Sequence, residues 1–358
     1  MRVLLAGGGT AGHVEPALNL ADVLTARDPA TEVVMLGTER GLEMRLVPER
    51  GYDLELITAV PMPRRANGDL IRLPNRLRTS VREVRAIMAR RQSEVVVGFG
   101  GYVAMPAYLA ARRRRPIVIH EANAKAGLAN RVGARFTPFL AEATPGALPH
   151  AITLGIPLRP AIVALDRGAQ RQEGRIAFDL DPDRPCLFVF GGSLGARRIN
   201  EAVVAALPQL VAEGVQVLHA IGTNNSDQVA DVPAQCLPHY RAVTYIDRMD
   251  LAYAAADLAL CRAGAMTCAE LAAVGLPAIY VPLPIGNGEQ RLNAAPTVAA
   301  GGGEFLADAD LTADRIAAQA TALLADPKVR ERMSAAAAAH GVRDAGARLA
   351  DMVELAIR

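Results

Sequence analysis

The strongest constraint on the fold is a pattern that occurs twice: a short apolar run, then glycines, then a helical periodicity. Residues 2–6 (RVLLA) lead into the glycine-rich stretch 7–13, and residues 186–190 (CLFVF) lead into the stretch 191–196. A buried strand, a glycine turn and a helix form the opening unit of a Rossmann-like domain. The repeat therefore predicts an α/β chain with two Rossmann-like, doubly wound domains, and 358 residues suit two domains. We expect the linker between them in the charge-rich sequence that runs to Pro185, a strand over residues 242–246, and helical structure throughout the alanine-rich residues 312–358.

Small and polar residues follow three strands that we expect in the first half of the chain. They occupy residues 7–13, 98–102 and 120–123. Because the carboxyl ends of parallel strands meet at one edge of a sheet, these residues predict a ligand crevice there.

The spacing of the first glycines also fits GxGxxG, a motif that is weak by itself. An NAD-binding domain is expected to end its second strand with an acid, but Gly37-Thr38 stands there instead, which counts against NAD.

The second half contains a stretch with the features of a nucleotide pocket. A strand over residues 257–261 precedes a helix from Met266 to Val274, and a strand over residues 278–281 follows. Thr267 and Glu270 lie three residues apart, on one face of that helix. A helix N-terminus suits a phosphate, and a carboxylate one turn further can accept two hydrogen bonds from a ribose diol. The alternative is a capped helix in an ordinary α/β domain.

Composition excludes several classes of protein. With 39 basic and 37 acidic residues, the chain lacks the overall basic character of a nucleic-acid binder. No apolar run reaches the roughly 18 residues that a membrane-spanning helix needs, and the N-terminus does not have the form of a signal peptide. The four cysteines lack a CxxC pair and histidine partners at zinc spacing, so we expect reduced, mostly buried thiols in a cytosolic protein.

The segment 64–91 is basic and amphipathic. It carries nine arginines, with apolar residues at spacings of three and four. Such a helix can lie on an anionic bilayer, or it can pack on its own domain with the arginines in water. We favour the second interpretation for residues 81–88 and leave both open for residues 64–78. The residues expected to contact a membrane are Leu70, Ile71, Arg72, Leu73, Arg76 and Leu77.

Eight motifs, taken together, resemble one known family. They are GGGTAGHVEPAL at 7–18, GFGGYVAMP at 98–106, HEANAKAGLANR at 120–131, GIPLR at 155–159, GGSLGA at 191–196, YIDRM at 245–249, CRAGAMTCAEL at 261–271 and NGEQRLNA at 287–294. In this order, over nearly the whole chain, they resemble the MurG family of peptidoglycan glycosyltransferases, enzymes of the GT-B fold. Two departures are Ala11, where the family usually has glycine, and Leu194, where it usually has glutamine.

The resemblance implies a domain organisation. Residues 1–158 would form an acceptor-binding, membrane-facing domain, and residues 159–340 would bind the UDP-sugar across a cleft. Residues 341–358 would form a C-terminal helix that can return to the first domain.

The resemblance also implies an activity. A transferase of this family moves N-acetylglucosamine from UDP-N-acetylglucosamine to the undecaprenyl-linked muramoyl-pentapeptide, lipid I. The reaction inverts the anomeric centre and gives the β-1,4-linked lipid II of peptidoglycan. The expected location is the cytoplasmic face of the cell membrane, as a peripheral protein on an anionic surface and without nucleic acid.

Donor contacts carry over residue by residue from the family. Glu270 on the ribose hydroxyls agrees with the interpretation reached above from helix spacing alone. The substrate-binding residues that the resemblance implies are Thr10, Ala11, Gly12, Asn123, Arg159, Ser193, Ile246, Ala265, Met266, Thr267, Glu270 and Gln290.

An inverting transfer needs a general base on the acceptor side. His13, at the end of the first glycine stretch, is the best-placed histidine, although it can instead cap the helix or bind phosphate. His120 and Glu121 are the competing candidates. The DxD-like Asp179-Leu180-Asp181 precedes a strand instead of following one, so we expect a surface loop, no metal site and no cofactor.

Three other functions remain open at this point. The first is a different GT-B glycolipid glycosyltransferase with another donor or acceptor. The second is an NAD-dependent oxidoreductase, on the strength of GxGxxG. The third is a non-catalytic, membrane-docked protein that binds a sugar nucleotide.

Overall fold

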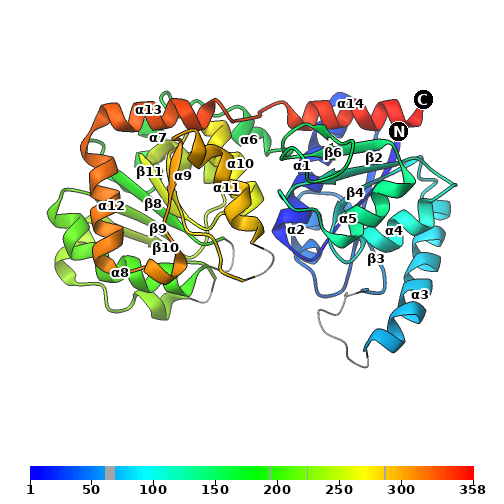
Figure 1. The fold of residues 1–358 in the computed structure, drawn as a ribbon, viewed down its shortest axis with the longest axis horizontal. Helices are drawn as coiled ribbons and strands as arrows, with labels where there is room; N and C mark the ends of the chain where they lie inside the picture. Colours follow the sequence, from blue (N-terminus) through cyan, green and yellow to red (C-terminus); the bar gives the residue numbers. More distant parts are fainter. Residues whose placement is uncertain (61–68, 193–194, 224, 286–287) are drawn as a thin grey trace. The chain divides into compact units, whose positions relative to one another are not determined.

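The computed structural model describes residues 1–60, 69–192, 195–223, 225–285 and 288–358, with the backbone alone for residues 69–72. The chain divides into two compact units (Figure 1). Unit 1 comprises Met1–Pro160 and Arg343–Arg358, and unit 2 comprises Ala161–Val342. The last residues of the chain thus belong to the same unit as the first.

Unit 1 contains a seven-stranded sheet with the order β3-β2-β1-β4-β5-β6-β7, and every neighbouring pair is parallel. Its central strands are buried along nearly their whole length, as expected for a sheet with helices on both faces. The strands are β1 (Arg2–Gly7), β2 (Glu32–Gly37), β3 (Asp53–Leu56), β4 (Val95–Gly100), β5 (Ile117–Glu121), β6 (Phe139–Glu142) and β7 (Ile152–Thr153).

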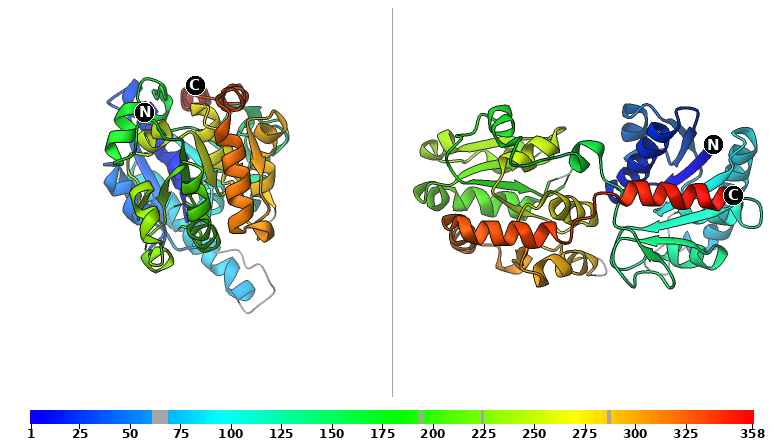
Figure 2. Two further views of the ribbon diagram at one scale, coloured as in Figure 1. Left: turned by 90° about the vertical axis from the view of Figure 1, so that its left-hand side faces the viewer. Right: turned by 90° about the horizontal axis from the view of Figure 1, so that it is seen from above.

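Helices cover both faces of this sheet. Leu349 and Val353 of α14 share a core with Leu5 and Leu18, and α14 lies beside α1 (Figure 2). On the other face, α3 and α4 form a second core around Leu4. The helices of unit 1 are α1 (Ala11–Arg27), α2 (Glu43–Glu49), α3 (Asp69–Arg90), α4 (Ala104–Ala111), α5 (Leu128–Gly133), the short 3₁₀ turn η1 (Ala134–Phe136) and α14 (Ala345–Ile357).

Unit 2 contains a six-stranded parallel sheet with the order β10-β9-β8-β11-β12-β13. One of its faces is covered by α8 and α12, whose apolar residues pack around Leu187 and Val189. The strands are β8 (Cys186–Phe190), β9 (Gln216–Ala220), β10 (Tyr240–Val243), β11 (Leu258–Cys261), β12 (Ala278–Tyr280) and β13 (Gly303–Phe305).

The remaining helices connect these strands or extend the chain after them. They are α6 (Pro160–Val163), α7 (Arg171–Ala177), α8 (Arg197–Ala212), α9 (Met249–Ala255), α10 (Ala265–Val274), α11 (Glu289–Ala299), α12 (Ala313–Ala325) and α13 (Pro327–Ala338), with 3₁₀ turns η2 (Ser226–Val229), η3 (Ala234–His239) and η4 (Asp308–Asp310). The prediction of two doubly wound, Rossmann-like α/β domains is confirmed.

Both sheets reverse their strand order next to the strand that starts the unit. In unit 1 the reversal lies between β1 and β4, and in unit 2 it lies between β8 and β11. In open α/β sheets, ligands bind beyond the carboxyl ends of the strands at such a switch point. The loops there begin at residues 8, 101, 191 and 262, so the glycine-rich stretches that start at residues 7, 98 and 191 lie at the switch points.

Two predicted elements differ from the structure. The strand expected over residues 242–246 is β10, Tyr240–Val243, because its pairing with β9 starts at Tyr240. The alanine-rich region 312–358, expected to be helical throughout, is divided into the helices α12, α13 and α14. Asp326 caps α13 by accepting a hydrogen bond from the Lys328 N–H at 2.8 Å, and Pro327 follows it at the first helical position, so a new helix begins there.

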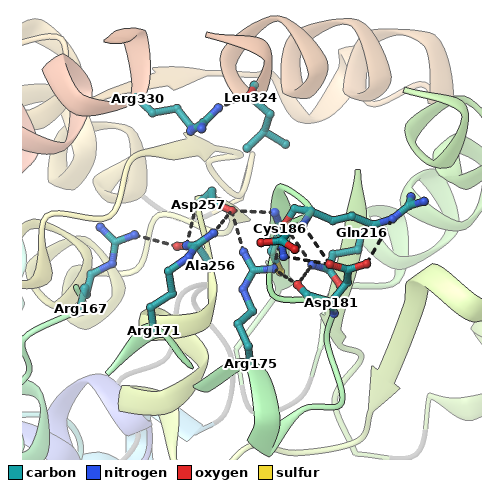
Figure 3. A network of polar contacts seen from close by, with 12 residues as sticks. Arg167, Arg171, Arg175, Asp181, Cys186, Gln216, Ala256, Asp257, Leu324 and Arg330 are labelled. Carbon is teal, nitrogen blue, oxygen red and sulfur yellow. Dashed lines mark hydrogen bonds and ion pairs between the residues drawn. The ribbon is translucent and has the colours of Figure 1, made fainter. Parts of the chain in front are cut away.

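The charge-rich sequence after residue 160, which the pattern predicts to be a linker, lies inside unit 2. Figure 3 shows the reason: two arginines of this segment, Arg171 and the buried Arg175, contact Asp257. Arg171 donates to both carboxylate oxygens, at 2.8 and 3.2 Å, and Arg175 donates at 2.9 Å. The Cys186 N–H, at the start of β8, adds a fourth hydrogen bond at 2.8 Å. Asp257 therefore joins α7 to the central strand.

We predict that Asp257→Asn destabilises unit 2 by about 3–5 kcal/mol at pH 7, because Arg175, only 1% exposed, loses its counter-charge. Burial acts to raise the pKa of Asp257, but the hydrogen bonds from Arg171 and Cys186 outweigh it, and the pKa lies below its usual value. A carboxylate whose pKa is lower in the folded state than in the unfolded state stabilises the fold at a pH above its unfolded-state pKa. This stabilisation is lost as the pH falls through the folded-state pKa. The gap between variant and wild type should therefore shrink in acid.

Denaturant unfolding at pH 7 and at pH 3.5 measures this gap. Asp179→Asn is the matched control, because the Asp179 side chain is 89% exposed and its ion pair with Arg241 lies at the surface. An equal loss of stability in both variants would contradict the role given to Asp257.

Candidate functional site

In unit 1, the loops after β1 and β4 touch. Gly7 pairs with Gly100 in the sheet, and the next residue, Gly101, has a φ of +79°. A Cβ atom on Gly101 would lie 2.0 Å from the carbonyl oxygen of Gly8, so only glycine fits at this position. The two glycine stretches thus build one floor at the switch point of the sheet.

His13 stands on this floor in the first turn of α1. Its Nδ1 lies 3.1 Å from the Thr10 hydroxyl, and a Cβ atom on Gly100 would lie 3.0 Å from its Nε2. Burial lowers the pKa of His13 from its usual value, while Glu121, the Gly8 backbone and Glu43 act in the opposite direction. The imidazole is therefore neutral at pH 7, which is the form that can accept a proton.

The two competing base candidates are buried. Burial lowers the pKa of His120 to about 4, and its Nε2 lies 2.7 Å from the Gly155 carbonyl. Glu121, 2% exposed, accepts hydrogen bonds from the backbone of Asn123 and Gly127, both at 3.0 Å, and from the Asn130 amide at 2.9 Å. Both oxygens of Glu121 thus hold the loop that follows β5.

Glu43 is a residue of this site that the sequence did not reveal. It is fully buried at the start of α2, and its Oε2 accepts a hydrogen bond from the Gly9 N–H at 2.9 Å. Its Oε1 accepts from the backbone and hydroxyl of Thr38, at 3.0 and 3.2 Å. One carboxylate therefore fixes the loop after β1 to the loop after β2. The local sequence gives no signal for it, because the acid that directly follows Gly37-Thr38 is Glu39, and Glu43 stands five residues after Thr38.

In unit 2, the predicted nucleotide residues gather at the loop between β11 and α10. Glu270 lies one turn inside α10, is 4% exposed, and accepts a hydrogen bond from the Tyr253 hydroxyl at 2.7 Å. Ala265 begins the helix and is buried, while Met266 and Thr267 are half-buried. The position of Glu270 in α10 is thus fixed by a neighbouring helix.

Gln290 ties two loops of this edge together. Its Oε1 accepts hydrogen bonds from the Ala263 N–H at 3.2 Å and from the Leu283 N–H at 2.9 Å. The Asn293 side chain also reaches the Ala263 carbonyl, at 3.3 Å. The predicted sugar contact Gln290 therefore lies at the turn that leads into α10.

The other predicted ligand residues occupy different positions. Ile246 is buried in the segment between β10 and α9, and Asn123 is half-buried beside Glu121. Arg159 is half-buried near the end of the first part of unit 1. Ser193 lies outside the described residues. Thr10, Ala11 and Gly12 lie at the start of α1, with Thr10 exposed.

The basic segment forms α3, and its two halves differ. Val84, Ile87 and Met88 are buried in the core of unit 1, which confirms the favoured interpretation for residues 81–88. Leu73, Arg76 and Leu77 are half-buried in the first half, whereas the side chains of Leu70, Ile71 and Arg72 lie outside the described part of the chain. A groove of about 760 Å³ between α3 and α4 is lined by Arg78, Arg82, Arg85, Arg112 and Arg113 together with apolar residues.

Three other features bear on chemistry. Asp179 is exposed, and among the described residues no group of three or more His, Cys, Asp or Glu side chains is placed to hold a metal. All four cysteines are free and buried, as predicted. The helices that the structure describes include none long and apolar enough to cross a membrane.

Comparisons with known proteins agree over almost the entire chain. Residues 3–138 match the N-terminal domain, and residues 186–349 the C-terminal domain, of glycosyltransferase family 28. Two similar proteins are the UDP-N-acetylglucosamine--N-acetylmuramyl-(pentapeptide) pyrophosphoryl-undecaprenol N-acetylglucosamine transferases of Acidothermus cellulolyticus and Streptomyces coelicolor. The first is 59% identical, over 99% of this chain and 98% of its own length. The second is 56% identical, over 100% of this chain and 98% of its own.

A solved structure is similar at lower identity. The crystal structure of MurG from Acinetobacter baumannii superposes with a TM-score of 0.77 and 29% identity, over 99% of both chains. The similarity covers both Rossmann-like units, which agrees with the GT-B architecture that the motifs imply.

We predict that Glu43→Gln destabilises unit 1 and makes the glycine-rich loop after β1 more mobile. A glutamine has one acceptor oxygen, so it cannot serve both the Gly9 and the Thr38 N–H groups. Losing one hydrogen bond to a charged group should cost about 1.5–3 kcal/mol of unfolding free energy. Hydrogen exchange should also become faster in a peptide that covers residues 5–14.

Glu49→Gln is the control for this variant, because Glu49 is an exposed residue of the same helix, paired with Arg45 at the surface. The structural role of Glu43 is refuted if exchange over residues 5–14 is the same in both variants.

Proposed function

The chain belongs to glycosyltransferase family 28, and from this premise we propose that it transfers N-acetylglucosamine from UDP-N-acetylglucosamine to the undecaprenyl-linked muramyl-pentapeptide. The observation that carries the proposal is the identity of 56–59%, over nearly full length, with enzymes of that name. The product is lipid II, and the enzyme is a hexosyltransferase of peptidoglycan synthesis.

We place the donor nucleotide on unit 2. Helix α10 begins at the switch point, so its first N–H groups point towards the space where a diphosphate can bind. Glu270, one turn further, can accept two hydrogen bonds from the ribose hydroxyls, and Tyr253 fixes its carboxylate. Ile246 would contact the base, and Gln290 the sugar. Ser193 and Arg159 complete the proposed donor set by resemblance to the family.

We place the acceptor and the general base on unit 1. The acceptor hydroxyl oxygen attacks the anomeric carbon, and the bond from that carbon to the β-phosphate oxygen breaks, so UDP leaves with the electron pair. His13 takes the proton of the hydroxyl. Its neutral imidazole, oriented by Thr10 above the glycine floor, is suited to this task. Thr10, Ala11 and Gly12 would border the diphosphate, with Asn123 beside them.

Transfer assays with radiolabelled UDP-N-acetylglucosamine and a short-chain, lipid-linked muramyl-pentapeptide test the proposal. Wild type should form product with or without EDTA. The groups proposed to donate hydrogen bonds to the diphosphate are backbone N–H groups and an arginine, and these do not depend on a metal ion. His13→Gln should lower kcat by about 100-fold or more. Wild-type kcat/KM should fall as the pH drops below the pKa of His13, because only the neutral ring accepts a proton.

His340→Gln is the control, since His340 is exposed at the end of α13. If kcat/KM of His13→Gln falls at low pH in the same way as kcat/KM of wild type, His13 is not the base. Absence of product with wild type would refute the transferase itself. If the chain were instead an NAD-dependent oxidoreductase, NAD would raise its melting temperature and UDP would not.

We also propose that the enzyme is peripheral, on the cytoplasmic face of the membrane. The acceptor in the relatives' name carries an undecaprenol chain, which resides in a bilayer. Residues 73–78 of α3 and the arginine-lined groove beside them form a basic, partly apolar surface on unit 1. Each arginine close to an anionic surface contributes roughly 1 kcal/mol, so several can hold the protein reversibly.

Co-sedimentation with vesicles tests the membrane proposal. Wild type should bind vesicles that contain anionic lipid and dissociate at high salt. Replacing Arg72, Arg76 and Arg78 by alanine should weaken binding by at least tenfold. A control triple variant at Arg315, Arg332 and Arg358, all exposed elsewhere, should bind like wild type. Equal binding to neutral and anionic vesicles would remove the proposal.

A further inference from the structure

Unit 1 contains a cavity that none of the residues predicted to bind the substrates explains. Its volume is about 530 Å³, and it opens where β2 and β3 end. Thr38 and Arg40 line it from the loop after β2, residues 56–59 from the chain that leaves β3, and Arg76 and Glu83 from α3. A cavity of this volume is in the usual range for small-molecule sites.

A buried carboxylate joins this cavity to the glycine floor. Glu43 accepts two hydrogen bonds from Thr38, which lines the cavity, and one from the Gly9 N–H. Gly9 immediately precedes Thr10, the partner of His13. The cavity and the proposed base are therefore held in a fixed arrangement within one unit.

The cavity has an apolar floor and a charged rim. Leu56, Ile57 and Ala59 supply the apolar surface. The acidic Glu83 is already engaged, because it accepts hydrogen bonds from the Thr58 backbone at 2.6 Å and from its hydroxyl at 2.8 Å. Its negative charge is thus partly stabilised by hydrogen bonds from Thr58, a residue that also lines the cavity.

Arg40 is the cation that this site presents to a ligand. It is exposed, and within the described part of the chain its guanidinium forms no hydrogen bond or ion pair. Arg76, from α3, adds a second positive charge, and the exposed Glu39 is the opposing charge on the rim. An arginine fork matches the geometry of a carboxylate. The cavity is therefore suited to an extended, partly apolar group that ends in a carboxylate.

We propose that this cavity binds the peptide arm of the acceptor, with a peptide carboxylate on Arg40. The inference rests on the proposed function, because the relatives' name specifies a pentapeptide on the muramyl sugar. Muramic acid is itself a carboxylic acid, so a peptide joined to it by an amide keeps its own terminal carboxylate. The reacting hydroxyl would then lie at His13, and the peptide would extend over the loops that Glu43 joins, those after β1 and β2, into the cavity.

Kinetics with two acceptors in detergent test the inference. One acceptor is the short-chain, lipid-linked muramyl-pentapeptide, and the other is the same molecule with the muramyl carboxyl converted to a simple amide. For Arg40→Ala, KM for the pentapeptide acceptor should rise about tenfold, the effect of losing a charged hydrogen bond. KM for the peptide-free acceptor and for UDP-N-acetylglucosamine should change less than about twofold. Arg40→Lys should give an intermediate KM.

Arg114→Ala is the matched control, because Arg114 is an exposed arginine of unit 1 between α4 and β5, at the opposite edge of the sheet. A melting temperature equal to that of wild type shows that the variants are folded. An unchanged KM for the pentapeptide acceptor, or an equal rise for both acceptors, overturns the inference. If wild type transfers to neither acceptor, the proposed function itself fails, and this outcome is distinct from the others.

Discussion

The close approach of two backbone loops at the switch point of unit 1 is the constraint on which the site depends. Gly101 lies against the carbonyl of Gly8, and no side chain fits between them. The loop after β1 can therefore lie flat on the loop after β4, and α1 can begin directly above. His13 is in the first turn of that helix, so its position follows from the glycines. Unit 2 repeats the same strand order around β8.

Two buried carboxylates stabilise loops of unit 1 by accepting hydrogen bonds from the chain. Glu43 holds the loops after β1 and β2, and Glu121 holds the loop after β5. Asp257 joins α7 to the start of β8. A buried charge is tolerated when it is paired or fully hydrogen-bonded, and backbone N–H groups of irregular loops need acceptors. At Glu43 and Glu121 the same hydrogen bonds satisfy both requirements.

The sequence predicted the fold well where hydrophobic pattern and glycine turns decide the structure. The strands that begin each unit, the polar strand ends and the helix that carries Glu270 all follow from local pattern. Contacts between residues far apart in the sequence determined the features that the sequence did not predict. The segment that contains Arg171 and Arg175 has the composition of a linker, but its hydrogen bonds to Asp257, far away in sequence, attach it to unit 2. Glu43 could not be identified either, because its partner Gly9 is 34 residues away. Pairing with β9 likewise determined where β10 begins.

The acids that fix the loops also bear on the proposed chemistry. Burial disfavours a charge on His13, whereas the carboxylates of Glu121 and Glu43 favour it. A general base must be neutral before the reaction and cationic once it has taken the proton. Burial supplies the first condition, and the two fixed carboxylates ease the second by stabilising the imidazolium through space. Neither acid has to move, because its oxygens are held by backbone and side-chain donors. The two acids that hold the loops around the glycine floor thus also set the electrostatic environment of His13.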